Sequence, residues 1–337
     1  MASITKIFSI FVAYLAIAVI SSRQLCAQDE NQRMVRIYED NDALKIFGKI
    51  SDRAYSNGTR LDYFFTPGKT NFFLHKLMPK AGQGSQDTYG IAVMQIMITP
   101  KDLRRNSFVA NDYRYAGALF LTHTLHSTNE SKQFDLQSEW ILGVMGPPAM
   151  AKETQVFLHK LVDFVRPRGW DNQLPADLLL NYSLALEKAV PLHSKSVEFT
   201  GGGKVFLGTM LNGASIYTLF RLGKMNPYFK NYTGQFTSGS GSGKRMQYYL
   251  TIKPAADYIF YNALIEGGLF SKNKESMQTQ SNAYTNPSRL KLIGQLDIGA
   301  VVSWGKLGLS YTRKTSTGMI RGLPHHSIGN ISVYYGW

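Results

Sequence analysis

Gln155 and His159 are the pair of side chains in this sequence with the clearest capacity for chemistry. They lie four residues apart in segment 151–164, whose apolar spacing predicts a helix. Side chains at positions i and i+4 lie one above the other on a helix face, so an amide and an imidazole can address one small target together. An ordinary surface histidine is the simpler interpretation until other residues support the pair.

A second polar group lies early in the chain, where Glu39, Asp40 and Asp42 surround Asn41. Carboxylate and amide oxygens are ligands that Ca²⁺ prefers, but the cluster is too short for an EF-hand loop, and a solvated turn is the simpler interpretation. Ser56 lacks the Gly-x-Ser-x-Gly surroundings of a hydrolase nucleophile, so its hydroxyl is first interpreted as a hydrogen-bonding or turn group.

The first 27 residues predict a cleaved secretory signal peptide. Lys6 precedes an apolar run over 7–20, which is shorter than the roughly 20 residues of a transmembrane helix. We expect cleavage after Ala27. Lipid modification of Cys26 is the weaker interpretation, because the bulky Leu25 before it is unlike the small residues of a lipid-modification site. Cleavage removes the only cysteine, which excludes disulfides and thiolate metal sites from the mature chain.

The mature chain, 28–337, is predicted to form one domain with a strong positive charge. The whole chain has a formal net charge of +14, and the signal segment contributes two basic residues and no acid. Such a charge on an exported protein favours anionic partners, chiefly lipid phosphates at a bacterial surface, and export argues against nucleic acid.

Most of the mature chain has the pattern of strands. Segments rich in aromatic and β-branched residues recur between turn-forming residues, which predicts about a dozen strands. They are 34–38, 59–65, 89–98, 115–124, 134–144, 178–186, 204–207, 215–222, 247–252, 258–266, 292–303, 305–312 and 328–337. The glycine-rich stretches 201–203 and 238–243 are interpreted as turns or loops of the same domain.

Three features favour a transmembrane antiparallel β-barrel over a soluble sandwich, which would alternate polar and apolar residues equally well. The chain contains 19 Tyr and 19 Phe, as aromatic girdles require. Several strands have the 9 to 11 residues of a tilted bilayer crossing. The chain also ends inside a strand on Trp337, an aromatic terminus typical of bacterial outer-membrane barrels.

The order of several short motifs resembles the outer-membrane lipid A 3′-O-deacylase family, from about Arg36 to the C-terminus. The motifs are Asn41-Asp42, Asp52-x-x-Tyr55-Ser56-x-Gly58, Tyr115-Ala-Gly117, Leu142-Gly-Val-x-Gly-Pro147, and Gln155-x-x-x-His159 followed by Gly169-Trp170-x-x-Gln173. Tyr261-Asn262 and the terminal aromatic residue fit as well.

The resemblance implies a 12-strand barrel in the outer membrane, with an active site between its wall and a short helix. It implies a Ca²⁺-assisted hydrolase that removes a 3′-O-linked acyl chain from the lipid A of lipopolysaccharide. His159 would then be the general base, beside Gln155, with Asn41 and Ser56 as further catalytic residues and Asp42 as the metal ligand. We expect a monomer.

The chain departs from the family pattern at two places. The acid that members can carry six residues after the histidine is Val165 here, with Asp163 nearby, and Ile96 follows Gln95 where Asp or Asn is usual. Lys101, Arg104 and Arg105 either bind lipid phosphates or solvate a loop. Trp170 is interpreted as a packing anchor rather than a substrate contact.

Two alternatives remain open from the sequence. A barrel of this shape without the activity would be a channel or a lipopolysaccharide-binding protein. An esterase of the same mechanism could instead act on phospholipid, because acyl-chain selectivity depends on the shape of the site rather than on these motifs.

Overall fold

The computed structural model describes residues 32–46, 54–66, 73–107, 109, 112–192, 194–237, 245–271 and 289–337. The predicted signal peptide, Asp52 of the motif pattern and the glycine-rich stretch 238–243 therefore lie outside the described residues. Within the described residues, no helix is long and apolar enough to cross a membrane.

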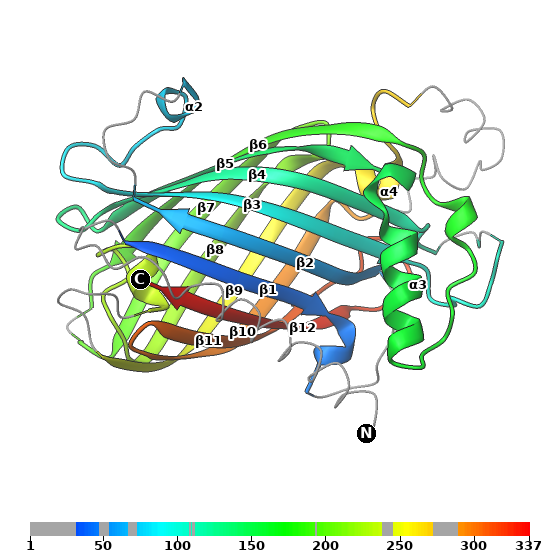
Figure 1. Ribbon diagram of the computed structural model, residues 1–337. Coiled ribbons are helices and arrows are strands. Elements are labelled where there is room, and N and C mark those ends of the chain that lie inside the picture. The colour runs from blue at the N-terminus through cyan, green and yellow to red at the C-terminus, as the bar shows by residue number, and fades with distance from the viewer. Residues whose placement is uncertain are drawn as a thin grey trace.

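The strands form a closed antiparallel barrel in which each pairs with its chain neighbours and β1 pairs with β12 (Figure 1). Their bounds are β1 Arg33–Asn41, β2 Ala54–Phe65, β3 Gln86–Thr99, β4 Ala116–Asn129, β5 Phe134–Met145, β6 Asp177–Val190, β7 Val197–Gly208, β8 Leu211–Lys224, β9 Met246–Asn262, β10 Leu292–Trp304, β11 Leu307–Ser316 and β12 His326–Gly336. This confirms the predicted 12-strand fold.

Short helices lie in the connections. The α-helices are α2 Phe73–Lys76, α3 Ala151–Leu161 and α4 Ala263–Glu266, and the 3₁₀ turns are η1 Asp42–Leu44, η2 Pro147–Ala149, η3 Trp170–Asn172 and η4 Thr233–Gln235. α3 begins where the sequence predicts a helix and ends three residues earlier. The barrel closes beside the chain end, where the Trp337 N–H donates to Arg33 O at 2.9 Å.

One predicted break in the sheet is wrong. Residues 247–252 and 258–262 belong to the single strand β9, which continues through Pro254, and the remaining residues of the second segment, 263–266, form α4. Proline has no N–H to donate, and the β8–β9 pairing accommodates it: the register runs to Tyr217↔Ala255 and resumes at Phe220↔Ile252. On its other side, β9 keeps its pairing with β10 through Pro254.

The glycines at 201–203 lie inside β7 and do not form the predicted turn. Gly202 faces the ring of Tyr217 on the neighbouring strand, and a Cβ at this position would lie 2.4 Å from Tyr217 Cε2. Glycine is thus required here for close packing of an aromatic ring on the backbone rather than for a chain reversal.

The two faces of the barrel wall differ in polarity. Side chains alternate along a strand, and the lumen-facing set includes Asp62, which binds Arg36 at 2.9 Å and Arg60 at 2.8 Å. Exposed apolar side chains cover the outer face, as in outer-membrane barrels. Among them are Leu61, Ile91, Val93, Leu121, Leu142, Leu180, Leu207, Ile216, Leu250, Ile298 and Leu309.

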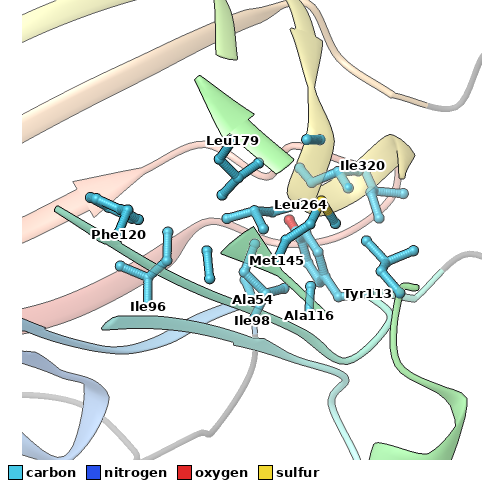
Figure 2. Close-up of a cluster of buried hydrophobic side chains, with 14 residues drawn as sticks. Ala54, Ile96, Ile98, Tyr113, Ala116, Phe120, Met145, Leu179, Leu264 and Ile320 are labelled. Atoms are coloured by element: carbon cyan, nitrogen blue, oxygen red, sulfur yellow. The ribbon is translucent and has the colours of Figure 1, made fainter. Parts of the chain in front are cut away.

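Figure 1 shows α3 and α4 at one end of the barrel and the C-terminus at the other. At the α4 end, buried apolar side chains from the wall pack against this helix (Figure 2), among them Ile96, Phe120, Leu179 and Leu264. This cluster fills part of the barrel interior close to the level at which α3 lies outside.

The segment 225–237, between β8 and β9, covers the interior at the opposite end. Its Tyr232 ring stacks on His126 of β4 with the centroids 3.7 Å apart. Its Phe236 ring stacks on Tyr334 of β12 at 4.3 Å. Because β4 and β12 lie on different sides of the barrel, the segment reaches across its end.

Candidate functional site

Helix α3 is fixed to the outer face of β3 and β4. Gly117 of β4 has no side chain, which lets Ala151 approach: a Cβ on Gly117 would lie 2.4 Å from the Ala151 Cβ. The Gln95 amide of β3 donates from Nε2 to Ala149 O at 2.7 Å, just before the helix. The close approach of the helix to the strand therefore requires a residue without a side chain at position 117.

Gln155 faces the barrel from α3 and is buried. Its Oε1 accepts a hydrogen bond from Trp170 Nε1 at 2.7 Å, and the Trp170 ring packs on Tyr115 with the centroids 4.8 Å apart. Trp170 is almost completely buried. The indole therefore anchors the packing, as the sequence predicts, and it also fixes the orientation of the Gln155 amide.

His159 lies one helical turn after Gln155, and its ring is held from one side. Nδ1 lies 2.6 Å from the backbone oxygen of Val165, and the Phe164 ring packs edge-on at 5.1 Å. A carbonyl oxygen can only accept, so a neutral imidazole in this position carries its proton on Nδ1 and the lone pair on Nε2. Val165, which replaces the acid of the family pattern, therefore orients the imidazole through its backbone oxygen.

Asn41 and Asp42 end β1 and begin η1. Asn41 caps this turn, because its Oδ1 accepts from Ala43 N at 2.8 Å. The Asp42 side chain is completely buried. Asn41 pairs with Asn57 of β2 in the register, which places it beside the strand that carries Ser56.

Ser56 lies at a β-bulge, where the register of β2 on β3 shifts between Tyr55 and Asn57. Its buried hydroxyl donates to Met97 O at 3.4 Å. Met97 packs in one apolar cluster with Ala151 of α3 and with Trp170. Ser56 is thereby connected to the helix that carries Gln155 and His159.

The three acids of the predicted cluster do not converge. β1 alternates its side chains, so Asp40 faces the lumen, where Lys314 binds it at 3.2 Å, while Glu39 faces outward. Among the described residues, no group of three or more His, Cys, Asp and Glu side chains is placed to hold a metal ion. Asp40 and Asp42 are buried, so the simpler interpretation of these acids as a solvated turn is wrong.

An outward-facing row of polar side chains, not predicted from the sequence, lies next to Asn41. The register joins Glu39 to Thr59 and Thr59 to Gln95, across β1, β2 and β3. The Glu39 carboxylate accepts from Asn57 Nδ2 at 2.5 Å and from Thr59 Oγ1 at 2.6 Å. The available signal was the two-residue spacing between Glu39 and Asn41, which places both on one face of a strand.

The three cations considered as phosphate ligands lie in an exposed connection between β3 and β4. Arg105 is paired with Asp102 at 3.4 Å, and the Arg104 N–H donates to the same carboxylate at 3.1 Å. The Lys101 N–H donates to Asp112 at 2.9 Å. These contacts shape a surface turn.

The chain matches the family model described as outer membrane protein LpxR over residues 10–337. Its fold is similar to that of LpxR from Salmonella typhimurium, with a TM-score of 0.70 and 15% identity over 90% of this chain and 99% of that chain. No curated protein matches.

Two further barrels are less similar. The beta domain of the Bordetella autotransporter BrkA has a TM-score of 0.42 and 11% identity over 91% of this chain and 99% of that chain. The COG4313 outer membrane channel from Pseudomonas putida F1 has a TM-score of 0.39 and 7% identity over 94% of this chain and 98% of that chain.

Proposed function

The chain belongs to the LpxR family of outer membrane proteins, and on this premise we propose that it is a lipid A 3′-O-deacylase. Membership supports an outer-membrane lipid A deacylase and confirms the family resemblance seen in the motifs. The proposed reaction removes the 3′-O-linked acyloxyacyl chain of lipid A by hydrolysis. The observation that carries this mechanism is His159, held through Nδ1 by Val165 O on a helix fixed to the outer face of the barrel.

The proposed chemistry begins with water near His159 Nε2. The imidazole takes a proton as the water oxygen attacks the ester carbonyl carbon, and the carbonyl electrons move to oxygen. When the tetrahedral intermediate collapses, the bond to the sugar oxygen breaks and the imidazolium returns the proton to that oxygen. The products are a free fatty acid and a sugar hydroxyl, so no enzyme nucleophile is needed.

Amide N–H groups are the proposed stabilisers of the developing oxyanion. Asn41 uses Oδ1 for its cap to Ala43 N, which directs its NH₂ group away from that turn. The Gln155 Oε1 accepts from Trp170 Nε1, which directs the Gln155 NH₂ group away from the indole. Fixed donors stabilise charge at an oxyanion without reorganisation during the reaction.

Calcium is the proposed cofactor, with Asp42 as its anionic ligand. Ca²⁺ takes six to eight oxygens, so one carboxylate would be supplemented by backbone carbonyls, water and substrate. Bound there, the ion would supply electrophilic stabilisation of the ester carbonyl. We expect EDTA to abolish activity, Ca²⁺ to restore it, and Asp42→Asn to raise the Ca²⁺ concentration needed; equal activity in EDTA would exclude calcium.

The proposed setting is a monomeric barrel that spans the outer membrane after removal of residues 1–27. The apolar outer face supports the membrane-spanning arrangement. With α3 on that same face, an ester in a neighbouring lipid could reach His159 without leaving the membrane. The lumen, by contrast, holds ion pairs such as Arg60–Glu139 at 2.9 Å and is covered by segment 225–237, which disfavours the alternative of an open channel.

The decisive experiment is mass spectrometry of lipid A from cells expressing the chain or its His159→Ala variant. We expect the chain to remove the mass of one acyloxyacyl group and the variant to leave lipid A intact. Identical lipid A in both strains, where a 3′-linked acyloxyacyl substrate is present, would rule the function out. A panel of purified phospholipids in the same assay tests the phospholipase alternative.

A further inference from the structure

The outer face of β1 and β2 carries a carboxylate that the proposed mechanism does not use. Glu39 lies on the outer face because Asp40, the next residue, binds Lys314 in the lumen. On β2, Thr59 shares its face with Leu61 and Tyr63, two exposed side chains of the outer face. Glu39 pairs directly with Thr59, so its charge lies at the border of an apolar surface.

The Glu39 carboxylate is oriented by neighbours rather than neutralised by a cation. Asn57 Nδ2 and Thr59 Oγ1 each donate to a different carboxylate oxygen. Asn41 is a further side-chain hydrogen-bond partner of the same group. An ionised carboxylate has about four acceptor positions, so three donors fix its direction without saturating it.

The barrel fold itself does not require this carboxylate. A charged group beside an apolar surface loses favourable hydration, and the lumen-facing Asp62 and Asp40 offset that cost with Arg or Lys partners. Glu39 has instead neutral donors, two of which belong to Asn41 and its register partner Asn57. Its position is therefore tied to the candidate site.

We propose that Glu39 binds substrate, accepting a hydrogen bond from a hydroxyl or amide N–H that a glycolipid carries beside its ester. The proposal rests on the proposed function for the identity of the lipid. A carboxylate repels phosphate, so this part of the site would contact the neutral hydrogen-bond donors of the substrate. Asn57 and Thr59 position the carboxylate, and Asn41 connects it to the reacting ester.

The test measures affinity without turnover. Lipid A binding is titrated in EDTA, in detergent, with His159→Ala as the reference and Glu39→Ala or the isosteric Glu39→Gln added to it. A hydrogen bond to a charged acceptor is worth enough that we expect Glu39→Ala to weaken binding about tenfold or more. Glu39→Gln, which keeps one acceptor oxygen, should lose less.

Glu130→Gln in the same background is the matched control, because it removes the same charge from an exposed turn after β4. It should leave affinity unchanged. The heat-dependent gel mobility typical of barrels reports folding for every variant, and Glu39→Gln remains informative if Glu39→Ala does not fold.

Unchanged affinity in both folded Glu39 variants would overturn the proposal. A loss seen only with Ca²⁺ present, and absent in EDTA, would assign Glu39 to a cation and overturn it too. The two proposals fail separately: if the wild-type chain releases no fatty acid, the deacylase function fails, whereas deacylation with unchanged affinity in the Glu39 variants removes only this inference.

Discussion

Polar side chains occupy both faces of this barrel wall, but they are used differently on each. In the lumen, Asp62 lies between Arg36 and Arg60, and Arg60 continues to Glu139. On the outer face, Glu39, Asn57 and Thr59 bond to each other beside Asn41 and have apolar neighbours such as Leu61. These four lumen groups form a network of opposite charges, whereas the outer carboxylate has neutral donors and leaves acceptor capacity directed outward.

The difference separates structural polarity from functional polarity. A buried charge is costly without a partner, so the network of Arg36, Asp62, Arg60 and Glu139 is explained by folding alone. A lipid-facing surface needs no polar group, so a polar row on it requires another explanation. Variants on the outer face should therefore lower kcat, whereas variants in the lumen should lower the free energy of unfolding.

The largest effect should come from His159 on the outer face. His159→Ala removes the proposed general base, and general base catalysis contributes about 10²–10⁴-fold to the rate. We expect kcat to fall by that factor in a fatty-acid release assay, while the midpoint of denaturant unfolding stays the same. An unfolding midpoint that falls together with kcat would contradict the assignment of His159 to catalysis rather than to stability.

A lumen variant should show the opposite behaviour. Asp62→Ala leaves Arg36 and Arg60 without their shared carboxylate, and breaking a buried ion pair costs about 3–5 kcal/mol. We expect that loss in the free energy of unfolding from lipid vesicles, measured by urea titration. The kcat of the molecules that remain folded should be unchanged; a fall in it would contradict the division.

An intermediate effect is expected for the anchor of Gln155. Trp170→Phe keeps the ring but removes the N–H that donates to Gln155 Oε1, and an unpaired buried acceptor costs about 1–3 kcal/mol. If the amide stabilises the oxyanion, kcat falls by roughly tenfold while KM changes little. Trp140→Phe is the control, since this indole packs on Tyr182 away from α3. Equal kinetics in both variants would remove Gln155 from the mechanism.

The smallest effect should come from the exposed ion pair between α3 and η3. Lys152 Nζ lies 2.6 Å from Asp171 Oδ1, and both side chains are well exposed. Such pairs contribute about 0–1 kcal/mol. We expect Lys152→Ala to change neither the unfolding midpoint nor kcat measurably, and a large loss of kcat would show that charge on this helix takes part in substrate binding.

The sequence predicts the barrel well because alternation, aromatic residues and the terminal strand are local patterns. The prediction of two separate strands in place of β9 fails. Proline usually ends a strand because it has no N–H to donate, but Pro254 is tolerated where the pairing with β8 is interrupted. The prediction of a turn at 201–203 fails because three successive glycines indicate a turn, whereas the packing of the Tyr217 ring against Gly202 involves a neighbouring strand. Both errors concern contacts between strands, which no single segment reveals.

The candidate site is likewise predicted from the sequence only where local spacing is enough. The spacing in segment 151–164 predicts a helix that carries both Gln155 and His159, and α3 confirms this helix. The division of Glu39 and Asp40 between two faces depends on which face of β1 meets the lumen. The support of His159 by Val165 depends on a backbone oxygen, which residue type cannot encode.

Segment 225–237 also touches the two strands that close the barrel. Its Phe236 stacks on Tyr334 of β12, and its Thr233 hydroxyl donates to the Gln32 side chain, just before β1, at 2.7 Å. The first and last strands are therefore joined by side chains from the middle of the chain as well as by their own backbone. Insertion of the final strand and docking of this segment would then be one cooperative event during assembly, so that a barrel with an open seam would also have an uncovered lumen.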